Sequence, residues 1–123
     1  RIKLIASGKM INPSGVAAAL CLGADVGCSA RGFMFSLGCI QALQCNENTC
    51  PTGITTHDPK LQKGLDPNVK ADRVANYAIS MREEVELIAH SCGVLDPQAL
   101  SHQHAFVIND QGQPSPLDTH VLP

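Results

Sequence analysis

The chain has few aromatic side chains, little net charge and no long apolar run. Its 123 residues include no tryptophan, one tyrosine and three phenylalanines, so we expect no stacking surface for nucleic acid. A net charge of −2 gives no electrostatic reason for a nucleic acid or an anionic membrane as a partner. No apolar run reaches the roughly 20 residues that a membrane-spanning helix needs. What remains is a small domain, or part of a larger one.

Cysteine, in contrast, is abundant, with six in the chain. An even number in a short chain can indicate a disulfide framework. However, no secretory pattern opens this sequence, and Cys21, Cys28 and Cys92 stand in apolar runs, where a free thiol behaves as a small buried hydrophobe. We therefore expect reduced thiols and a cytoplasmic location.

The other three cysteines, Cys39, Cys45 and Cys50, form a C-x5-C-x4-C pattern in a polar segment, with Pro51 directly after the third. Thiolates are the protein ligands of iron–sulfur clusters, and a Cys-Pro pair closes some ferredoxin ligand loops. The C-x2-C pair typical of structural zinc is missing. We expect this loop to hold an iron–sulfur cluster through three protein ligands. A zinc site, or inert or disulfide-bonded cysteines, are the alternatives.

The start of the chain has the pattern of a βαβ unit, which takes roughly thirty residues. An apolar run over residues 2–6 predicts a buried parallel strand. Asn12 is suited to cap a helix that ends at Gly23, and residues 24–30 predict a second strand. Because the sequence opens directly on an apolar strand, we also expect it to be the C-terminal part of a larger protein.

Further along, residues 33–43 predict a helix at least in part, and residues 52–66 predict an irregular segment. An apolar stripe at three- and four-residue steps predicts a long helix from Pro67 to just before Gly93. Asp96 can open a short further helix. The charged residues on the other faces of the long helix are assigned no chemistry.

These patterns predict a domain over residues 1–108, with the cysteine loop at 38–54, and an extended tail over residues 109–123. His102 and His104 alternate as they would on one face of a strand, which could form a metal pair. Since no third ligand stands nearby, surface or packing histidines are the favoured interpretation.

Both predicted strands are followed by short turns that contain glycine. Loops after the last two strands of a (β/α)8 barrel often bind phosphate, because glycine lets backbone N–H groups approach and a nearby cation offsets the charge. A plain surface turn with a solvated lysine is the alternative. The candidate phosphate-binding residues are Ser7, Gly8, Lys9, Ser29, Ala30 and Arg31.

The cysteine loop and its flanks resemble the cluster-binding loop of the FMN-dependent synthase domain of glutamate synthase. The likeness is carried by residues 32–41, Cys45 and residues 48–54. Earlier segments, Ala6–Lys9 and Ala19–Asp25, are similar to that domain's penultimate strand and following helix. The resemblance continues to about His104 and is weaker afterwards.

The resemblance implies an α/β fold: the C-terminal βα units of a TIM (β/α)8 barrel with a cluster-binding loop and a long C-terminal helix. Cys39, Cys45 and Cys50 would ligate a [3Fe–4S] cluster, and the candidate phosphate residues would surround the phosphate of FMN. The family reaction adds ammonia derived from glutamine to 2-oxoglutarate and reduces the imine by hydride transfer from FMN, giving L-glutamate. Electrons would come through the cluster from ferredoxin or from an NAD(P)H-oxidising subunit.

The chain holds only about two of the eight βα units of such a barrel. The flavin ring pocket and the 2-oxoglutarate site are therefore expected in sequence outside it, no residue is assigned a catalytic role, and the chain alone is expected to be inactive. An FMN and iron–sulfur oxidoreductase acting on another substrate, and a non-catalytic zinc-binding module, are the alternative functions.

Overall fold

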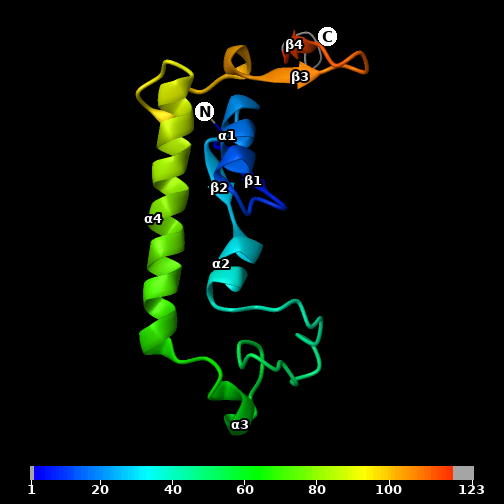
Figure 1. The fold of residues 1–123 in the computed structure, drawn as a ribbon, viewed down its shortest axis with the longest axis vertical. Helices are drawn as coiled ribbons and strands as arrows, with labels where there is room; N and C mark the ends of the chain where they lie inside the picture. The colour runs from blue at the N-terminus through cyan, green and yellow to red at the C-terminus, as the bar shows by residue number, and fades with distance from the viewer. Residues whose placement is uncertain (1, 118–123) are drawn as a thin grey trace. The chain divides into compact units, whose positions relative to one another are not determined.

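The computed structural model describes residues 2–117 and divides into two compact units. One unit contains the residues up to Ser29 and those from Met81 onward, and the other contains residues 30–80. The long helix α4 (Pro67–Ser91) contributes its first turns to one unit and its last turns to the other (Figure 1). The predicted long helix is therefore confirmed, with Asp66 accepting the Asn68 N–H at its start, 3.0 Å away.

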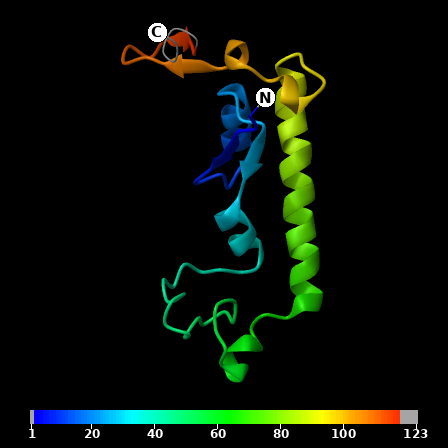
Figure 2. The ribbon, with the colours of Figure 1, turned by 180° about the vertical axis from the view of Figure 1, so that it is seen from behind.

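The first unit begins with the predicted strand–helix–strand pattern. The elements are β1 (Ile5–Ser7), α1 (Pro13–Cys21) and β2 (Val26–Cys28), and both views show them side by side (Figures 1 and 2). The strands pair in parallel, from Ile5 opposite Val26 to Ser7 opposite Cys28. Asn12 caps α1, since its Oδ1 accepts the Gly15 N–H at 2.9 Å. The second strand is shorter than predicted because Ala30 already begins α2 (Ala30–Ser36).

The core of this unit is small and lies where α1 meets the last turns of α4. Small side chains from both helices, Ala17 and Ala89, belong to this core, and Ala89 is fully buried. Cys21 is buried in the same cluster. The other buried members are Leu20, Val85 and Leu100.

After α4 the chain forms short elements. Asp96 caps the 3₁₀ turn η1 (Pro97–Ala99), as predicted, through a 2.9 Å bond from the Gln98 N–H. His102 and His104, whose alternation suits one face of a strand, lie instead in the 3₁₀ turn η2 (His102–His104), where His104 Nδ1 accepts the Ser101 N–H at 3.0 Å. That bond favours a turn over an extended backbone.

The strands β3 (Phe106–Ile108) and β4 (Pro114–Pro116) form an antiparallel hairpin in this unit. The predicted tail from residue 109 thus returns to pair with the preceding strand as far as it is described. Its last part, residues 118–123, lies outside the described residues.

The second unit contains α2, the cysteine loop, α3 (Pro59–Gln62) and the first turns of α4. Phe33 of α2 meets Tyr77 of α4 edge to face, with ring centroids 5.1 Å apart. The helix α3 interrupts the segment predicted to be irregular. Its start is capped by Asp58, whose Oδ1 accepts the Lys60 N–H at 2.8 Å.

Residues 2–117 form a small mixed α/β arrangement with a long helix, and their strands make two separate two-stranded sheets. No barrel is closed within this range. Parallel strands are normally covered on both faces, yet Ile5 is 70% and Val26 is 51% exposed. Among the described helices none has the length and apolar character needed to cross a membrane.

Candidate functional site

The three cysteines of the candidate site lie on one loop between α2 and α3. The first is set by the way α2 ends: Gly38 has a φ of 101°, and the Cys39 N–H donates to the Met34 carbonyl at 3.0 Å. This is the pattern of a Schellman cap, which fixes the chain direction directly after the helix. Cys39 therefore leaves α2 in a defined direction.

The backbone of this loop is held in conformations that L-amino acids rarely adopt. Gln41, Leu43 and Asn48 have φ values of 57°, 58° and 61°. Such left-handed residues are costly, and they gather at functional sites when the surrounding structure enforces them. A loop with three of them, close to three cysteines, has the character of a ligand-binding loop.

Two of the cysteines share one cavity. Cys39 and Cys45 line a cavity of about 360 Å³ together with Arg31. The Gln41 N–H donates to the Cys39 sulfur at 3.5 Å, the kind of contact that stabilises a sulfur carrying negative charge. Cys45 is exposed, so its thiol is accessible from solvent.

The third cysteine has an altered acidity. The hydroxyl of Thr52, 3.4 Å from the Cys50 sulfur, is the main cause that lowers the pKa of this thiol from 9.0 to about 6. Thr55 adds to the effect. At neutral pH Cys50 is mainly a thiolate, the form that ligates metals.

The donor set fits an iron–sulfur cluster by its chemistry. All six cysteines are free, so three unpaired thiols stand on one short loop, and two of them have hydrogen-bonding partners. Within residues 2–117 no three Cys, His, Asp or Glu side chains lie close enough to hold an ion. Cys50 is not part of the cavity lined by Cys39 and Cys45. The loop would therefore have to close further to bring three thiolates to one cluster.

The predicted phosphate residues are divided between the two units. Ser7 ends β1 beside Cys28, so the turn after β1 and Ser29 after β2 start from the same edge of the sheet. Gly8 and Lys9 both have positive φ, 111° and 55°. Ala30 and Arg31 stand in the first turn of α2, in the other unit.

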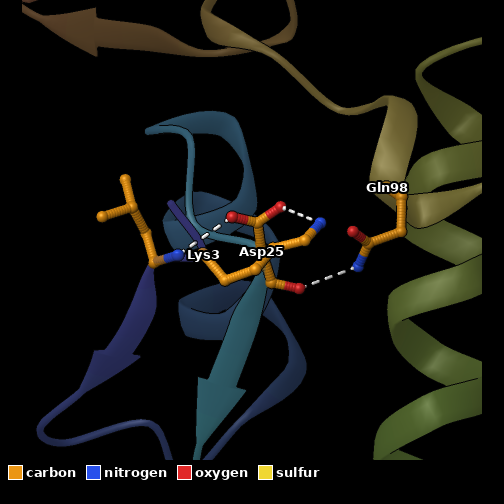
Figure 3. Close-up of polar contacts among 4 residues, drawn as sticks. Lys3, Asp25 and Gln98 are labelled. Atoms are coloured by element: carbon orange, nitrogen blue, oxygen red, sulfur yellow. Dashed lines mark hydrogen bonds and ion pairs between the residues drawn. The ribbon is translucent and has the colours of Figure 1, made fainter. Parts of the chain in front are cut away.

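A polar residue that sequence reasoning did not single out holds the first strand in place. Asp25 is 7% exposed; its carboxylate accepts from Lys3 Nζ and from the Leu4 N–H, each at 2.9 Å. The Gln98 side-chain amide donates to the Asp25 carbonyl at 3.0 Å (Figure 3). In the sequence, the signal available for Asp25 was its position after Gly23-Ala24 and directly before a strand. By fixing the entry to β1, Asp25 also fixes the turn that follows it.

Sequence reasoning also passed over Thr56, which is buried at 8% exposure beside the cysteine loop. Its hydroxyl donates to the Asn48 carbonyl at 2.7 Å. The signal was the group of threonines, Thr52, Thr55 and Thr56, that follows the Cys-Pro pair. His57, next in the chain, is exposed and donates its backbone N–H to Asn48 Oδ1.

Comparison with known proteins identifies the family. The family described as a conserved region in glutamate synthase matches residues 1–95. The glutamate synthase large subunit-like protein YerD of Bacillus subtilis is 46% identical over 121 residues, covering 98% of this chain and 23% of that protein. The archaeal glutamate synthase (NADPH) of Methanocaldococcus jannaschii is 35% identical over 99 residues, covering 80% of this chain and 19% of its own length.

The chain therefore spans about a fifth of the length of these two relatives. A further relative, the large chain of the glutamate synthase (NADPH) of Bacillus subtilis, is 34% identical over 87 residues, which are 69% of this chain and 6% of that protein. No solved structure matches the chain. Since the family match covers residues 1–95, which include the whole of α4, the chain belongs to the glutamate synthase family.

Proposed function

We propose that this chain is the cluster-carrying part of a glutamate-synthase-type oxidoreductase that forms L-glutamate from 2-oxoglutarate and ammonia derived from glutamine. The observation that carries the proposal is the loop with three free thiols, one of which has a hydroxyl 3.4 Å from its sulfur, inside the region that matches the family. Thiolates on one loop are suited to bind a redox cluster rather than to perform hydrolysis.

Cys39, Cys45 and Cys50 are the residues we assign to a [3Fe–4S] cluster, which supplies one-electron transfer when bound. The contacts of the loop fit this role. The Gln41 N–H and the Thr52 hydroxyl lie next to the sulfurs of Cys39 and Cys50, and such donors stabilise bound thiolates and tune the cluster potential.

For the phosphate of FMN we propose the turn residues at the carboxyl ends of the strands and the start of α2: Ser7, Gly8, Lys9, Ser29, Ala30 and Arg31. The cations Lys9 and Arg31 would offset the phosphate charge, and Gly8 leaves open space where a side chain would stand. FMN supplies hydride transfer when bound. The exposed faces of the parallel pair β1–β2 support a larger (β/α)8 barrel, completed by strands from outside this chain.

For the electron source, ferredoxin and an NAD(P)H-oxidising subunit are both compatible with a cluster that passes single electrons. The names of two relatives specify NADPH, which supports an NAD(P)H-oxidising subunit as the source.

The test uses the natural full-length polypeptide, purified without oxygen. We expect iron and sulfide, a flavin, the EPR signal of an oxidised three-iron cluster, and glutamate formation from 2-oxoglutarate and glutamine. Cys45→Ser should remove the EPR signal, whereas Cys92→Ser, at an exposed cysteine outside the loop, should retain it.

Three other outcomes would contradict the proposal in different ways. A wild-type protein without iron would exclude the cluster. Stoichiometric zinc would instead support a zinc-binding module. Iron and flavin without glutamate formation would assign the protein to another substrate.

A further inference from the structure

The second half of the cysteine loop is closed on itself by two short hydrogen bonds that one asparagine accepts. The Asn48 carbonyl accepts from the Thr56 hydroxyl at 2.7 Å, and Asn48 Oδ1 accepts from the His57 N–H at 2.6 Å. Asn48 has a φ of 61°, a left-handed conformation that asparagine tolerates better than most residues. We call this pair of bonds the Asn48–Thr56 clasp; Cys50 lies between its two ends in the chain.

One end of the clasp is anchored to α3. Thr56 is 8% exposed, and its Oγ1 accepts the Asp58 N–H at 3.1 Å while it donates to Asn48. The Gln62 side-chain amide donates to the Thr56 carbonyl at 3.0 Å. Because Asp58 also caps α3, the position of Thr56 is set by a helix and not by the loop alone.

Within the clasp, the turn that contains Cys50 rests directly on backbone. The Gly53 N–H donates to the Cys50 carbonyl at 3.1 Å, and Gly53 has a φ of 79°. A Cβ at Gly53 would collide with the Leu61 carbonyl oxygen and would stand 3.1 Å from the Leu65 nitrogen. No side chain fits between this turn and the end of α3, so the turn has little room to shift.

We propose that Asn48 and Thr56 are positioning residues that hold Cys50 in place for the cluster. This inference rests on the proposed function. Cys50 stands inside a segment closed by the two hydrogen bonds of the clasp, and two further bonds hold Thr56 to the start of α3 and to Gln62, whereas the exposed Cys45 lies before the clasp. The clasp thus fixes the part of the loop that carries Cys50, and Cys45 lies outside it.

The test compares matched variants of the natural full-length polypeptide, purified without oxygen. Thr56→Val removes the hydroxyl with little change of shape, and Thr56→Ser restores it. Asn48→Gly removes the side chain while allowing the left-handed backbone. Thr49→Val is the control, because Thr49 is exposed in the same loop and makes only a 3.4 Å contact with Gln44.

Two measurements are made. The first is the rate at which a chelator removes iron, together with the EPR line shape of the oxidised cluster. We expect Thr56→Val and Asn48→Gly to lose iron about tenfold faster or more, with a broadened signal, because supporting partners of metal ligands commonly affect affinity by that factor. Thr56→Ser and Thr49→Val should behave like the wild type.

The second measurement is hydrogen–deuterium exchange of residues 48–58 in the iron-free protein. This exchange should accelerate in Thr56→Val and Asn48→Gly.

The inference would be overturned if iron release and the EPR line shape did not change in Thr56→Val, even with faster exchange. The clasp would then stabilise the loop without positioning Cys50 for the cluster. Unchanged exchange together with unchanged iron release would overturn it as well. A wild-type protein that holds no iron is a different result: it removes the proposed function, and the positioning role with it.

Discussion

Single polar side chains fix the direction of this chain at places where its core is too small to do so. Asp25 is the strongest case in the first unit, since one buried carboxylate accepts from Lys3 and from the backbone of Leu4. Thr56 has the corresponding role in the second unit, where one hydroxyl both donates and accepts. Each side chain links segments that apolar packing covers poorly.

Replacing Asp25 should loosen the first strand. Asp25→Ala leaves the Leu4 N–H without its partner, and we expect local opening of residues 2–8 to become easier by about 1–3 kcal/mol. Native-state hydrogen exchange of the natural full-length polypeptide measures this. Lys3→Met is the control and should cost under about 1 kcal/mol, because the Lys3 side chain is 70% exposed and its ion pair is screened. Equal effects of the two changes would contradict the role given to Asp25.

The cysteines outside the loop should differ in reactivity. Burial, and then the neighbouring Cys92, raise the pKa of Cys21 above 9.0, so Cys21 remains a thiol at pH 8. We expect iodoacetamide to modify Cys21 much more slowly than the exposed Cys28, as read by mass spectrometry of the folded protein. Similar rates would show that Cys21 is accessible.

The same shift has a consequence for stability. A raised pKa means that the folded state holds the proton more tightly than the unfolded state. The stability linked to the Cys21 thiol is thus complete below pH 9.0 and is lost as pH rises through the higher folded pKa.

At this scale the sequence identified the chemistry but not its support. Spacing and the following proline singled out Cys39, Cys45 and Cys50 as candidate ligands, because such a pattern is local in the sequence. The threonines after the Cys-Pro pair are only a weak signal for Thr56, since its importance comes from its bond to Asn48, eight positions away. Contacts of that range depend on the fold and cannot be read from neighbouring residues.

Among the elements, the close contact between the Cys50 turn and α3 is the most sensitive to substitution. Gly53→Ala puts a methyl group against the Leu61 carbonyl in addition to straining the backbone. Gly93→Ala is a matched control, because Gly93 has a similar φ of 82° and a Cβ there would meet nothing within 4 Å. We expect Gly53→Ala to destabilise its region by about 1–3 kcal/mol more than the control destabilises its own.

Limited proteolysis between residues 48 and 66 measures this difference, since cleavage follows the population of the opened segment. A Gly53→Ala protein as resistant there as the Gly93→Ala protein would show that the turn can move away from α3. The Asn48–Thr56 clasp would then be unable to fix Cys50.

The elements that the sequence predicted are those with strong local signals. Asn12 before Pro13 gave the start of α1, and the apolar stripe up to Gly93 gave α4. The helix α3 was missed because its four residues are too few for a periodic pattern. The alternation of His102 and His104 did not correspond to a strand, because the Ser101 N–H donates to the His104 ring and the chain turns there.

For the whole molecule, one prediction follows from the exposed sheet and from the small part of its relatives' length that the chain covers. The 123-residue chain produced alone should form no glutamate from 2-oxoglutarate and glutamine, and it should associate, because a parallel pair with Ile5 and Val26 exposed offers unpaired edges and apolar faces. Size-exclusion chromatography and a glutamate assay test both parts. A monomeric, active chain would contradict the proposed barrel.

At the scale of the whole molecule, the barrel expected from the sequence is not seen within residues 2–117. Resemblance of the loop and of the first βα unit implied it, but only two parallel strands lie within residues 2–117. A closed barrel depends on strands that pair across the whole polypeptide, so a chain covering about a fifth of its relatives cannot display it.

The unit β1–α1–β2 is closed by a contact of short range in the sequence, which bears on the order of folding. Leu4 and Asp25, joined by a hydrogen bond, are only 21 positions apart, so closing this segment costs little chain entropy. Short-range pairing of this kind is an efficient starting nucleus for a slow parallel architecture. Substitutions here should mainly retard refolding of the complete polypeptide, whereas changes in late-forming parts should mainly hasten its unfolding.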